Sequence, residues 1–299
     1  MTKILVVEDS SVDRILVGGL LGKELGWNIQ FANDGREALR KIESTGEDVF
    51  YPDVIVTDLQ MPNMNGLELV GHIRDFHSKI PVVLITSLGS EEIAIKALRA
   101  GATSFTPKSM IKGDLVRTVK QVLEMAGRMQ YARDNSSLPA PKQIAFVLEN
   151  DSSLIGATIE HLQSNLPSWS DKDRLQIGMA MDEALVNAMH HGNLEVDSQL
   201  RETENEASYY ELIRIRKSES PFCHRRVRVQ AEFSDQHISV QISDDGKGFN
   251  PELIPDPTSD ENLHNISGRG LYLIRSFMDS VDHNEAGNQI TMKKLREAS

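Results

Sequence analysis

The sequence is poor in cysteine and in basic residues, and it has no long hydrophobic run. Its one cysteine, Cys223, cannot form an intramolecular disulfide, which fits a reducing compartment. With 32 Lys and Arg against 44 Asp and Glu, the net charge of -12 argues against direct binding of nucleic acid, whose phosphates require a basic surface. No apolar run approaches the length that crosses a membrane, and the first residues do not resemble a signal peptide. We therefore expect a cytoplasmic protein without a membrane partner.

The length of the chain predicts two domains. A sequence of 299 residues is too long for one average domain, and each half is large enough to bury its own core. Apolar residues at helical spacing end near Met125, and the sequence then becomes polar and proline-punctuated, which is typical of a linker. The predicted limits are a first domain over 1–126, a linker over 127–141 and a second domain over 142–299.

The first domain has short apolar runs at 4–7, 54–56 and 82–85, separated by segments of helical periodicity. Buried strands that alternate with helices indicate an α/β fold with a doubly wound parallel sheet. Functional groups of such sheets gather beyond the carboxyl ends of the strands. The polar residues at those ends are Glu8, Asp9, Asp58, Thr86, Ser87 and Lys108.

Three acids at one edge of a sheet repel each other unless a cation lies among them. Oxygen ligands suit Mg²⁺, and a carboxylate beside that ion could accept a phosphoryl group. A hydroxyl group and an ammonium group nearby would then bind the phosphoryl oxygens. The alternative is that each acid only caps a helix, which explains any single acid better than it explains the whole set.

Residues 1 to about 125 resemble the receiver domain of bacterial two-component response regulators. The residues that carry this resemblance are Glu8, Asp9, the stretch Asp58 to Gly66, Thr86, Phe105 and Lys108. The resemblance implies a flavodoxin-like fold and a sensor histidine kinase or phosphotransfer protein as the partner that donates the phosphoryl group.

The resemblance also implies a role for each of these residues. Asp58 would be the phosphoacceptor, and Mg²⁺ would be bound by Glu8, Asp9, Asp58 and the main chain of Gln60. Thr86, Lys108 and Phe105 would form the switch that responds to the added negative charge. The chain departs from the family at Lys108-Ser109, where the family usually has a cis proline after the lysine. A cis bond before serine costs about 3 kcal/mol, so we expect a trans bond here.

The second domain contains a polar stretch, Met181 to Asn193, that we expect to be part of a helix over Asp171 to His191. At helical spacing Glu183, Asn187 and either His190 or His191 share one face. This stripe has two interpretations, a zinc site and a solvated polar face.

Two glycine clusters follow downstream. Asp244 with Gly246 and Gly248 comes after an apolar strand, and Gly268-Arg269-Gly270 opens an apolar helical run. Glycines allow close approach of a ligand to the backbone, and glycine before a helix N-terminus is a plausible phosphate cradle.

In this order the three motifs resemble the ATP-binding domain of histidine kinases, gyrase, Hsp90 and MutL (GHKL), over about 141–297. The resemblance implies a two-layer α/β sandwich of the Bergerat type that binds ATP and Mg²⁺. Glu183 would be the general base, Asn187 the Mg²⁺ ligand, and Asp244 the acceptor for the adenine amino group. The remaining residues implied in ATP binding are Gly246, Gly248, Gly268, Arg269, Gly270 and, as a substitute for a family threonine, Thr291. Helix termination before Gly192 explains His190 and His191 about as well as a phosphate contact does.

The sequence Glu-Ala-Leu-Val-Asn-Ala from Glu183 and the short segment between Gly248 and Gly268 resemble the anti-sigma-factor serine kinases. The linker leaves no room for the histidine-bearing hairpin of a true histidine kinase. The resemblance implies an ATP-dependent protein serine/threonine kinase that acts on an anti-anti-sigma protein of the STAS fold, with a sigma factor or a second copy of the chain as further partners. The interpretation is a response regulator in which phosphorylation of Asp58 controls this kinase. The alternative is a weakly catalytic ATP-binding module that sequesters a sigma factor or a STAS protein.

Residues 194–226 form an insertion in this second domain. It is acidic from Glu195 to Glu211 and basic from Arg214 to Arg228. A helix around Tyr209 and Tyr210 that binds a partner and a solvated excursion fit it equally well.

Overall fold

The computed structural model of the chain describes residues 1–44, 50–87, 91–134, 142–197, 200, 206–250 and 269–296. The chain divides into two compact units, Met1–Gly127 and Arg128–Ser299. Each unit has its own five-stranded sheet. The predicted ranges of the first domain (1–126), the linker (127–141) and the second domain (142–299) stay predictions.

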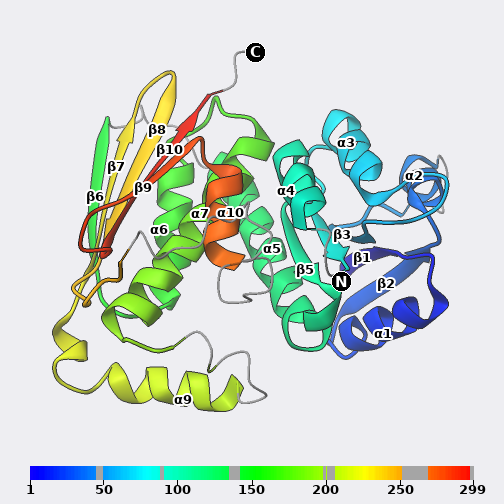
Figure 1. The fold of residues 1–299 in the computed structure, drawn as a ribbon. Helices are drawn as coiled ribbons and strands as arrows, with labels where there is room; N and C mark the ends of the chain where they lie inside the picture. Colours follow the sequence, from blue (N-terminus) through cyan, green and yellow to red (C-terminus); the bar gives the residue numbers. More distant parts are fainter. Residues whose placement is uncertain are drawn as a thin grey trace. The chain divides into compact units, whose positions relative to one another are not determined.

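The first unit is a parallel sheet between two layers of helices (Figure 1). Its strand order is β2-β1-β3-β4-β5, which is the flavodoxin-like order. The strands are β1 Thr2–Val7, β2 Trp27–Ala32, β3 Val54–Asp58, β4 Val82–Thr86 and β5 Ser104–Pro107. The helices are α1 Ser11–Leu21, α2 Gly35–Glu43, α3 Gly66–Phe76, α4 Glu91–Ala100 and α5 Ile111–Asp134. The predicted α/β fold is confirmed.

The three apolar runs found in the sequence are the three central strands β1, β3 and β4. They are buried on both faces, which is why their sequences are continuously apolar. The edge strand β2 is half-buried along most of its length, and its mixed sequence gave no comparable signal.

The helices after β1 and β3 have caps that are not the predicted site acids. The side chain of Ser10 accepts a hydrogen bond from the Asp13 amide and caps α1. Asn65 caps α3 through a capping box with Glu68. Because these residues satisfy the helix starts, the interpretation of Asp9 and Asp58 as helix caps is wrong.

The chain after β5 departs from the family pattern as expected. Lys108 begins a short 3-10 helix, η1 Lys108–Met110, and the Lys108–Ser109 bond is trans. Helix α5 extends to Asp134, past Met125, where the apolar pattern predicts its end. Residues 127–134 contain good helix formers, so the helix continues into the segment predicted as linker.

The second unit is an antiparallel sheet with helices on one face (Figure 1). Its strand order is β6-β7-β8-β10-β9. The strands are β6 Gln143–Leu148, β7 Val227–Phe233, β8 His237–Ser243, β9 Ser280–His283 and β10 Gln289–Leu295. The helices against the sheet are α6 Ser153–Gln163, α7 Asp171–Val186 and α10 Arg269–Phe277. Buried Ile238, Val240 and Ile242 alternate with half-buried residues along β8, as expected for a sheet covered on one side. This is the predicted two-layer sandwich.

Helix α7 does not continue as an α-helix to His191. It changes at Asn187 into a π-helix, η2 Asn187–Asn193. A π-turn is wider than an α-turn, so the 3.6-residue period used to align the polar stripe ends at Val186. The prediction of one regular helix over Asp171 to His191 is therefore wrong in its last turn.

The insertion is folded onto the second unit. It contains α9 Glu206–Arg216 and a 3-10 turn, η3 Phe222–His224. Tyr209 and Ile213 of α9 are buried with Leu194 and Val196 in a small apolar cluster. Its interpretation as a solvated excursion is therefore wrong.

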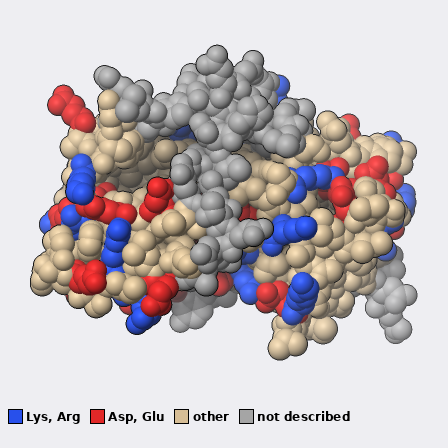
Figure 2. Space-filling model, turned by 60° about the horizontal axis from the view of Figure 1, so that its bottom comes forward, with Lys and Arg blue, Asp and Glu red and all other residues tan. Residues whose placement is uncertain are grey.

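Charged residues of the insertion are largely paired within the second unit. Arg225 contacts Glu195 at 2.9 Å and Lys217 contacts Asp151 at 3.2 Å. Figure 2 shows acidic and basic side chains interspersed on the described surface of both units. Within the part of the chain that the structure describes, no helix is both long enough and apolar enough to cross a membrane.

Candidate functional site

The three predicted acids of the first unit lie together. Glu8 and Asp9 follow β1, Asp58 ends the neighbouring strand β3, and their ligand oxygens all lie within 4.8 Å of one another. Glu8 is only 1% exposed and Asp58 only 5% exposed. The parallel register of β1 and β3 produces this cluster, because both strands end at the same edge of the sheet.

The charges of this cluster are only partly balanced. Burial raises the pKa of Glu8, and the nearby charge of Asp58 raises it further. Burial also raises the pKa of Asp58, although the Lys108 ammonium opposes that rise. An all-oxygen set with excess negative charge fits a hard divalent cation such as Mg²⁺. Glu8, Asp9 and Asp58 are the residues that would hold it.

Lys108 reaches into the acidic cluster from the end of β5. Its Nζ lies 3.4 Å from Glu8 Oε2, 3.5 Å from Asp58 Oδ1 and 2.6 Å from Asp13 Oδ2. Burial lowers the pKa of Lys108, but the hydrogen bond to Asp13 and the charges of Asp58 and Glu8 outweigh it, so the pKa is raised. The sequence analysis did not identify Asp13 as a partner of Lys108. Its position in the first turn of α1, a few residues after Glu8 and Asp9, could have indicated that it lies near the cluster.

The turn after Asp58 requires glycine at position 66. A Cβ atom on Gly66 would lie 2.3 Å from the main-chain oxygen of Asp58. The Gly66 amide donates to the Leu59 carbonyl at 3.0 Å, which closes the turn beside the cluster. Gln60 lies in this turn, and Mg²⁺ ligation by its main chain stays a prediction.

The predicted switch residues flank Asp58 on the next strands. Thr86 ends β4 one residue beyond Ile85, which pairs with Asp58, and Thr86 is buried. Phe105 in β5 is also buried, so its ring already lies inside the unit. Their participation in a switch stays a prediction.

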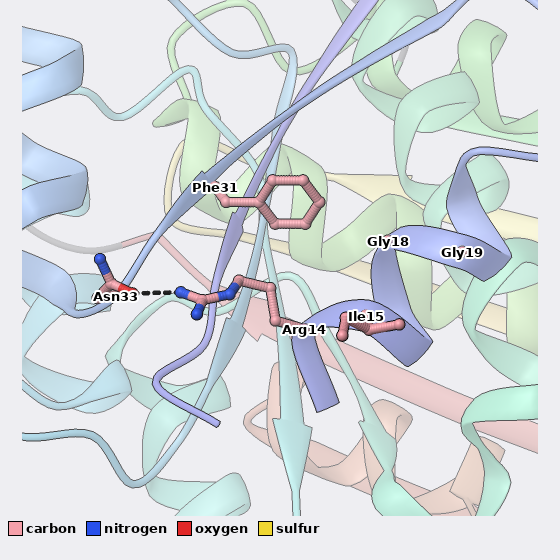
Figure 3. A pocket seen from close by; sticks show the side chains of 6 residues that line it. All are labelled: Arg14, Ile15, Gly18, Gly19, Phe31 and Asn33. Carbon is pink, nitrogen blue, oxygen red and sulfur yellow. Dashed lines mark hydrogen bonds between the residues drawn. The ribbon is translucent and has the colours of Figure 1, made fainter. Parts of the chain in front are cut away.

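A shallow pocket of about 350 Å³ lies between α1 and β2, and none of the predicted site residues lines it (Figure 3). Gly18 allows Phe31 to approach α1, because a Cβ at position 18 would lie 2.7 Å from the ring. Arg14 donates a hydrogen bond to Asn33 at the rim.

In the second unit, Asp244 is the centre of the first glycine cluster. Its carboxylate lies against Gly192, where a Cβ atom would come within 2.5 Å of Asp244 Oδ1. The Gly246 amide donates to Asp244 Oδ1 at 2.8 Å. Burial raises the pKa of Asp244 to about 6, despite that hydrogen bond. A half-buried carboxylate that keeps acceptor capacity, held between glycines, suits recognition of a ligand amino group.

Gly248 of this loop and Gly287 of the turn between β9 and β10 allow the two segments to approach closely. Gly248 has φ +70, and a Cβ there would lie 1.9 Å from the Ala286 carbonyl oxygen. Gly287 has the same φ of +70 and packs against Phe249 in the same way. Only glycine fits both the backbone conformation and the contact.

Glu183, Asn187 and the start of α10 lie side by side. A Cβ on Gly270 would lie 2.8 Å from Glu183 Oε2 and 3.6 Å from Asn187 Nδ2. The amides at the start of a helix favour negative charge, so this corner can hold phosphate groups. Arg269 begins α10, but its side chain and all of Gly268 lie outside the described residues.

Thr291 is not brought to this site. It pairs with Gln241 in the middle of β8 and alternates with Ile290 and Met292, which face the helices. Its side chain therefore points to the open face of the sheet, and the structure gives no support to its assignment to ATP binding. The residue that meets Asp244 is Asn288, directly before β10, which donates to the Asp244 carbonyl at 3.3 Å and accepts from the Asp244 amide at 3.0 Å.

Asn193 is a second residue that sequence reasoning did not assign. Its Oδ1 accepts from the Asp245 amide at 2.8 Å, and its Nδ2 donates to Asn150 at 2.8 Å. Asn193 is fully buried at the end of η2. Asn193 therefore connects η2 to the loop from Asp244 to Gly248. Its position directly after Gly192 was the feature of the sequence that could have indicated this role.

The two histidines have structural partners. His190 pairs through Nδ1 with the Tyr209 hydroxyl at 3.0 Å and through Nε2 with Ser152 Oγ at 2.9 Å. His191 pairs through Nδ1 with the Val196 carbonyl at 2.6 Å. Among the residues that the structure describes, only Glu8, Asp9 and Asp58 form a cluster with metal-ligand spacing. The zinc interpretation of the polar stripe is not supported.

Comparison with family models decides the identity of both units. Residues 4–120 match the response regulator receiver domain, and residues 150–294 match the histidine kinase-like ATPase domain. The chain joins a receiver domain to a histidine kinase-like ATPase domain. Both resemblances seen in the sequence are therefore confirmed at this level.

The receiver domain has relatives among curated proteins. A protein-glutamate methylesterase/protein-glutamine glutaminase of Treponema denticola is 38% identical over 36% of this chain and 28% of that protein. A similarly named enzyme of Rhodospirillum rubrum is 34% identical over 46% of this chain and 37% of that protein. The chain thus spans about a third of the length of the curated relatives it matches.

Solved structures similar to the chain include two receivers. The receiver domain of NtrX from Brucella abortus is 32% identical and covers 40% of this chain and 98% of its own, with a TM-score of 0.37. The response regulator TrrA from Thermotoga maritima is 32% identical and covers 40% of this chain and 98% of its own, with a TM-score of 0.35.

Proposed function

We propose that the chain is a response regulator in which phosphorylation of Asp58 controls an ATP-dependent protein serine/threonine kinase. The observation that carries the kinase proposal is the close approach of the Glu183 and Asn187 side chains to Gly270 at the start of α10. It places a carboxylate that can accept a proton beside an amide that can bind a metal ion, at a corner suited to phosphate.

In the receiver, a carboxylate oxygen of Asp58 attacks the phosphorus of a phosphohistidine on a sensor kinase or phosphotransfer protein. The new P–O bond forms as the P–N bond to the donor histidine breaks. Lys108, 3.5 Å from Asp58, and the hydroxyl of Thr86 bind the phosphoryl oxygens. A magnesium ion bound by Glu8, Asp9, Asp58 and the Gln60 main chain would neutralise part of the incoming charge.

In the ATPase domain, Asp244 accepts a hydrogen bond from the adenine amino group, and Asn187 would hold the magnesium ion of the triphosphate. Glu183 accepts the proton of a serine or threonine hydroxyl as its oxygen bonds to the γ-phosphorus. The bond to the ADP oxygen breaks in the same transfer. Main-chain amides at Arg269 and Gly270, at the start of α10, stabilise the charge on the transferred group.

The partner that accepts the phosphoryl group is an anti-anti-sigma protein of the STAS fold, and the pathway is a cytoplasmic partner switch that controls a sigma factor. This part of the proposal is supported by the Glu183 to Ala188 sequence, which resembles that of the anti-sigma serine kinases. The alternative is a module that binds ATP and sequesters its partner without transfer.

Incubation with γ-labelled ATP and a STAS-domain protein separates these two functions. We expect label on the partner with the unchanged chain and loss of that label in Glu183→Gln, while ATP binding is retained. Glu232→Gln, which changes an exposed acid on β7, is the matched control and keeps transfer. ATP-dependent association without any label on the partner would instead establish the sequestration module.

A further inference from the structure

The insertion at 194–226 contacts the end of the helix that carries Asn187. Tyr209 of α9 is 1% exposed, and its hydroxyl pairs with His190 Nδ1 at 3.0 Å. The two rings also meet edge to face, with centroids 5.9 Å apart. On its other side His190 pairs with Ser152, just before α6, at 2.9 Å. His190 is therefore held from both sides in the middle of the π-helix η2.

The base of the same insertion contacts the loop that carries Asp244. Glu195 accepts from Lys247 at 2.9 Å and from Arg225 at 2.9 Å. Arg225 also donates to the Asn193 carbonyl at 2.8 Å. Glu195 has φ +51, a left-handed conformation that costs energy for a residue with a side chain, so the surrounding contacts hold it there.

These contacts matter because η2 is a π-helix. Such a segment has poorer intrinsic stability than an α-helix and persists where neighbouring groups support it. Asn187 is the first residue of η2, and His190 follows within the same turn. Removal of the support at His190 therefore lets η2 relax toward α-helical geometry, which rotates Asn187 relative to the start of α10.

We propose that the insertion is a brace that positions Asn187, and that Tyr209 is its positioning residue. The inference rests on the proposed role of Asn187 as the ligand of the magnesium ion on ATP. The brace acts on the triphosphate end of the site, where Asn187 lies. The adenine end depends on Asp244, whose hydrogen bonds to Asn288 and Gly246 do not involve η2. The link from η2 to this loop runs through Asn193, at the other end of η2 from Asn187.

The neighbouring tyrosine provides a matched control. Tyr210 is 47% exposed and its ring meets the ring of Tyr209 edge to face, with centroids 5.4 Å apart, whereas Tyr209 is buried. Tyr209→Phe and Tyr210→Phe each remove one hydroxyl from the same helix, and only the first removes a partner of His190. Loss of a hydrogen bond to a buried imidazole costs more than loss of an exposed hydroxyl does.

The test is calorimetric binding of ATP with magnesium and of AMP in EDTA to the full chain. In Tyr209→Phe we expect affinity for magnesium ATP to fall about tenfold, equal to about 1.4 kcal/mol, with AMP affinity within about twofold of the unchanged chain. Tyr210→Phe leaves both affinities unchanged. Equal weakening of both nucleotides, or no weakening of either, overturns the brace.

Hydrogen exchange without nucleotide tests the brace independently of ATP binding. Amides of residues 187–193 exchange faster in Tyr209→Phe than in Tyr210→Phe, while those of β8 do not change. Unchanged exchange in 187–193 overturns the brace even where ATP binds normally. A third outcome separates the two proposals. If exchange in 187–193 is faster in Tyr209→Phe but the unchanged chain does not bind magnesium ATP, the contact of Tyr209 still supports η2 and the proposed function is refuted.

Discussion

At the scale of single residues, the receiver depends on one reactive carboxylate among three clustered acids. Asp58 is the member of the cluster that ends a strand and also contacts Lys108. We expect a small phosphodonor such as labelled acetyl phosphate to modify the unchanged chain and to leave Asp58→Asn unlabelled. Asp53→Asn, at an acid that binds the Lys3 amide before β3, keeps full labelling. Equal labelling of Asp58→Asn would refute the assignment.

Asp244 makes nucleotide binding depend on pH. Its pKa is raised to about 6 by burial, so below pH 6 the carboxyl is protonated in the free folded chain. Because the pKa of Asp244 is 3.8 in the unfolded chain and about 6 in the folded one, the free domain loses stability as the pH rises from 3.8 through about 6. Ligands that need the charged carboxylate bind better above pH 6.

We therefore expect adenine-nucleotide affinity to be about tenfold lower at pH 5 than at pH 7.5, because one unit below the pKa leaves about a tenth of the carboxyl ionised. Fluorescence titration with a labelled ADP across this range gives the profile. In Asp244→Asn the affinity is lower at every pH and the transition near pH 6 is lost. A transition that survives in Asp244→Asn would assign it to another group.

At the scale of elements, the turn between β3 and α3 has no room for a side chain at position 66. A Cβ at Gly66 would meet main-chain atoms of Asp58, which cannot swing away as a side-chain end can. We expect Gly66→Ala to lower the free energy of unfolding by about 1–3 kcal/mol and to weaken phosphorylation. Gly71→Ala in the same helix meets nothing within 4 Å and should stabilise by up to about 1 kcal/mol.

Urea unfolding followed by Trp27 fluorescence, in a Trp169→Phe background, measures both variants in the receiver. The chain has two tryptophans, so this background leaves a single reporter in β2. Equal stability of Gly66→Ala and Gly71→Ala would show that the close approach of Gly66 to Asp58 is not required.

Whether an element could be predicted from the sequence depends on how it is buried in the fold. Strands β1, β3 and β4 were found because burial on both faces demands a continuous apolar run. Strand β2 and the π-turn η2 were not found, because an edge strand has a mixed sequence and a π-turn has no compositional signature. The face of β10 that carries Thr291 depends on its register with β8, which sequence spacing alone does not fix.

At the scale of the whole molecule, the proposed function requires that the receiver alters the kinase. We expect treatment with acetyl phosphate to change the rate of phosphoryl transfer to the STAS partner, in either direction, in the unchanged chain. The same treatment leaves the rate of Asp58→Asn constant. An identical response in both would show that the phosphodonor acts elsewhere, and an unchanged rate in a chain labelled on Asp58 would show that the domains act independently.

The sequence by itself determined the two domain families and the α/β fold of each, and it located the clustered acids Glu8, Asp9 and Asp58. It could do so because parallel strands bring their carboxyl ends to one edge, and because acids, amides and glycines in a fixed order are seldom needed for folding alone. Only the tertiary structure decided which side chains meet across the fold. It brought Asp13 to Lys108, Asn193 and Asn288 to the loop of Asp244, and Tyr209 to His190. These contacts join segments far apart in the chain, and their geometry is set by packing that local sequence patterns do not specify.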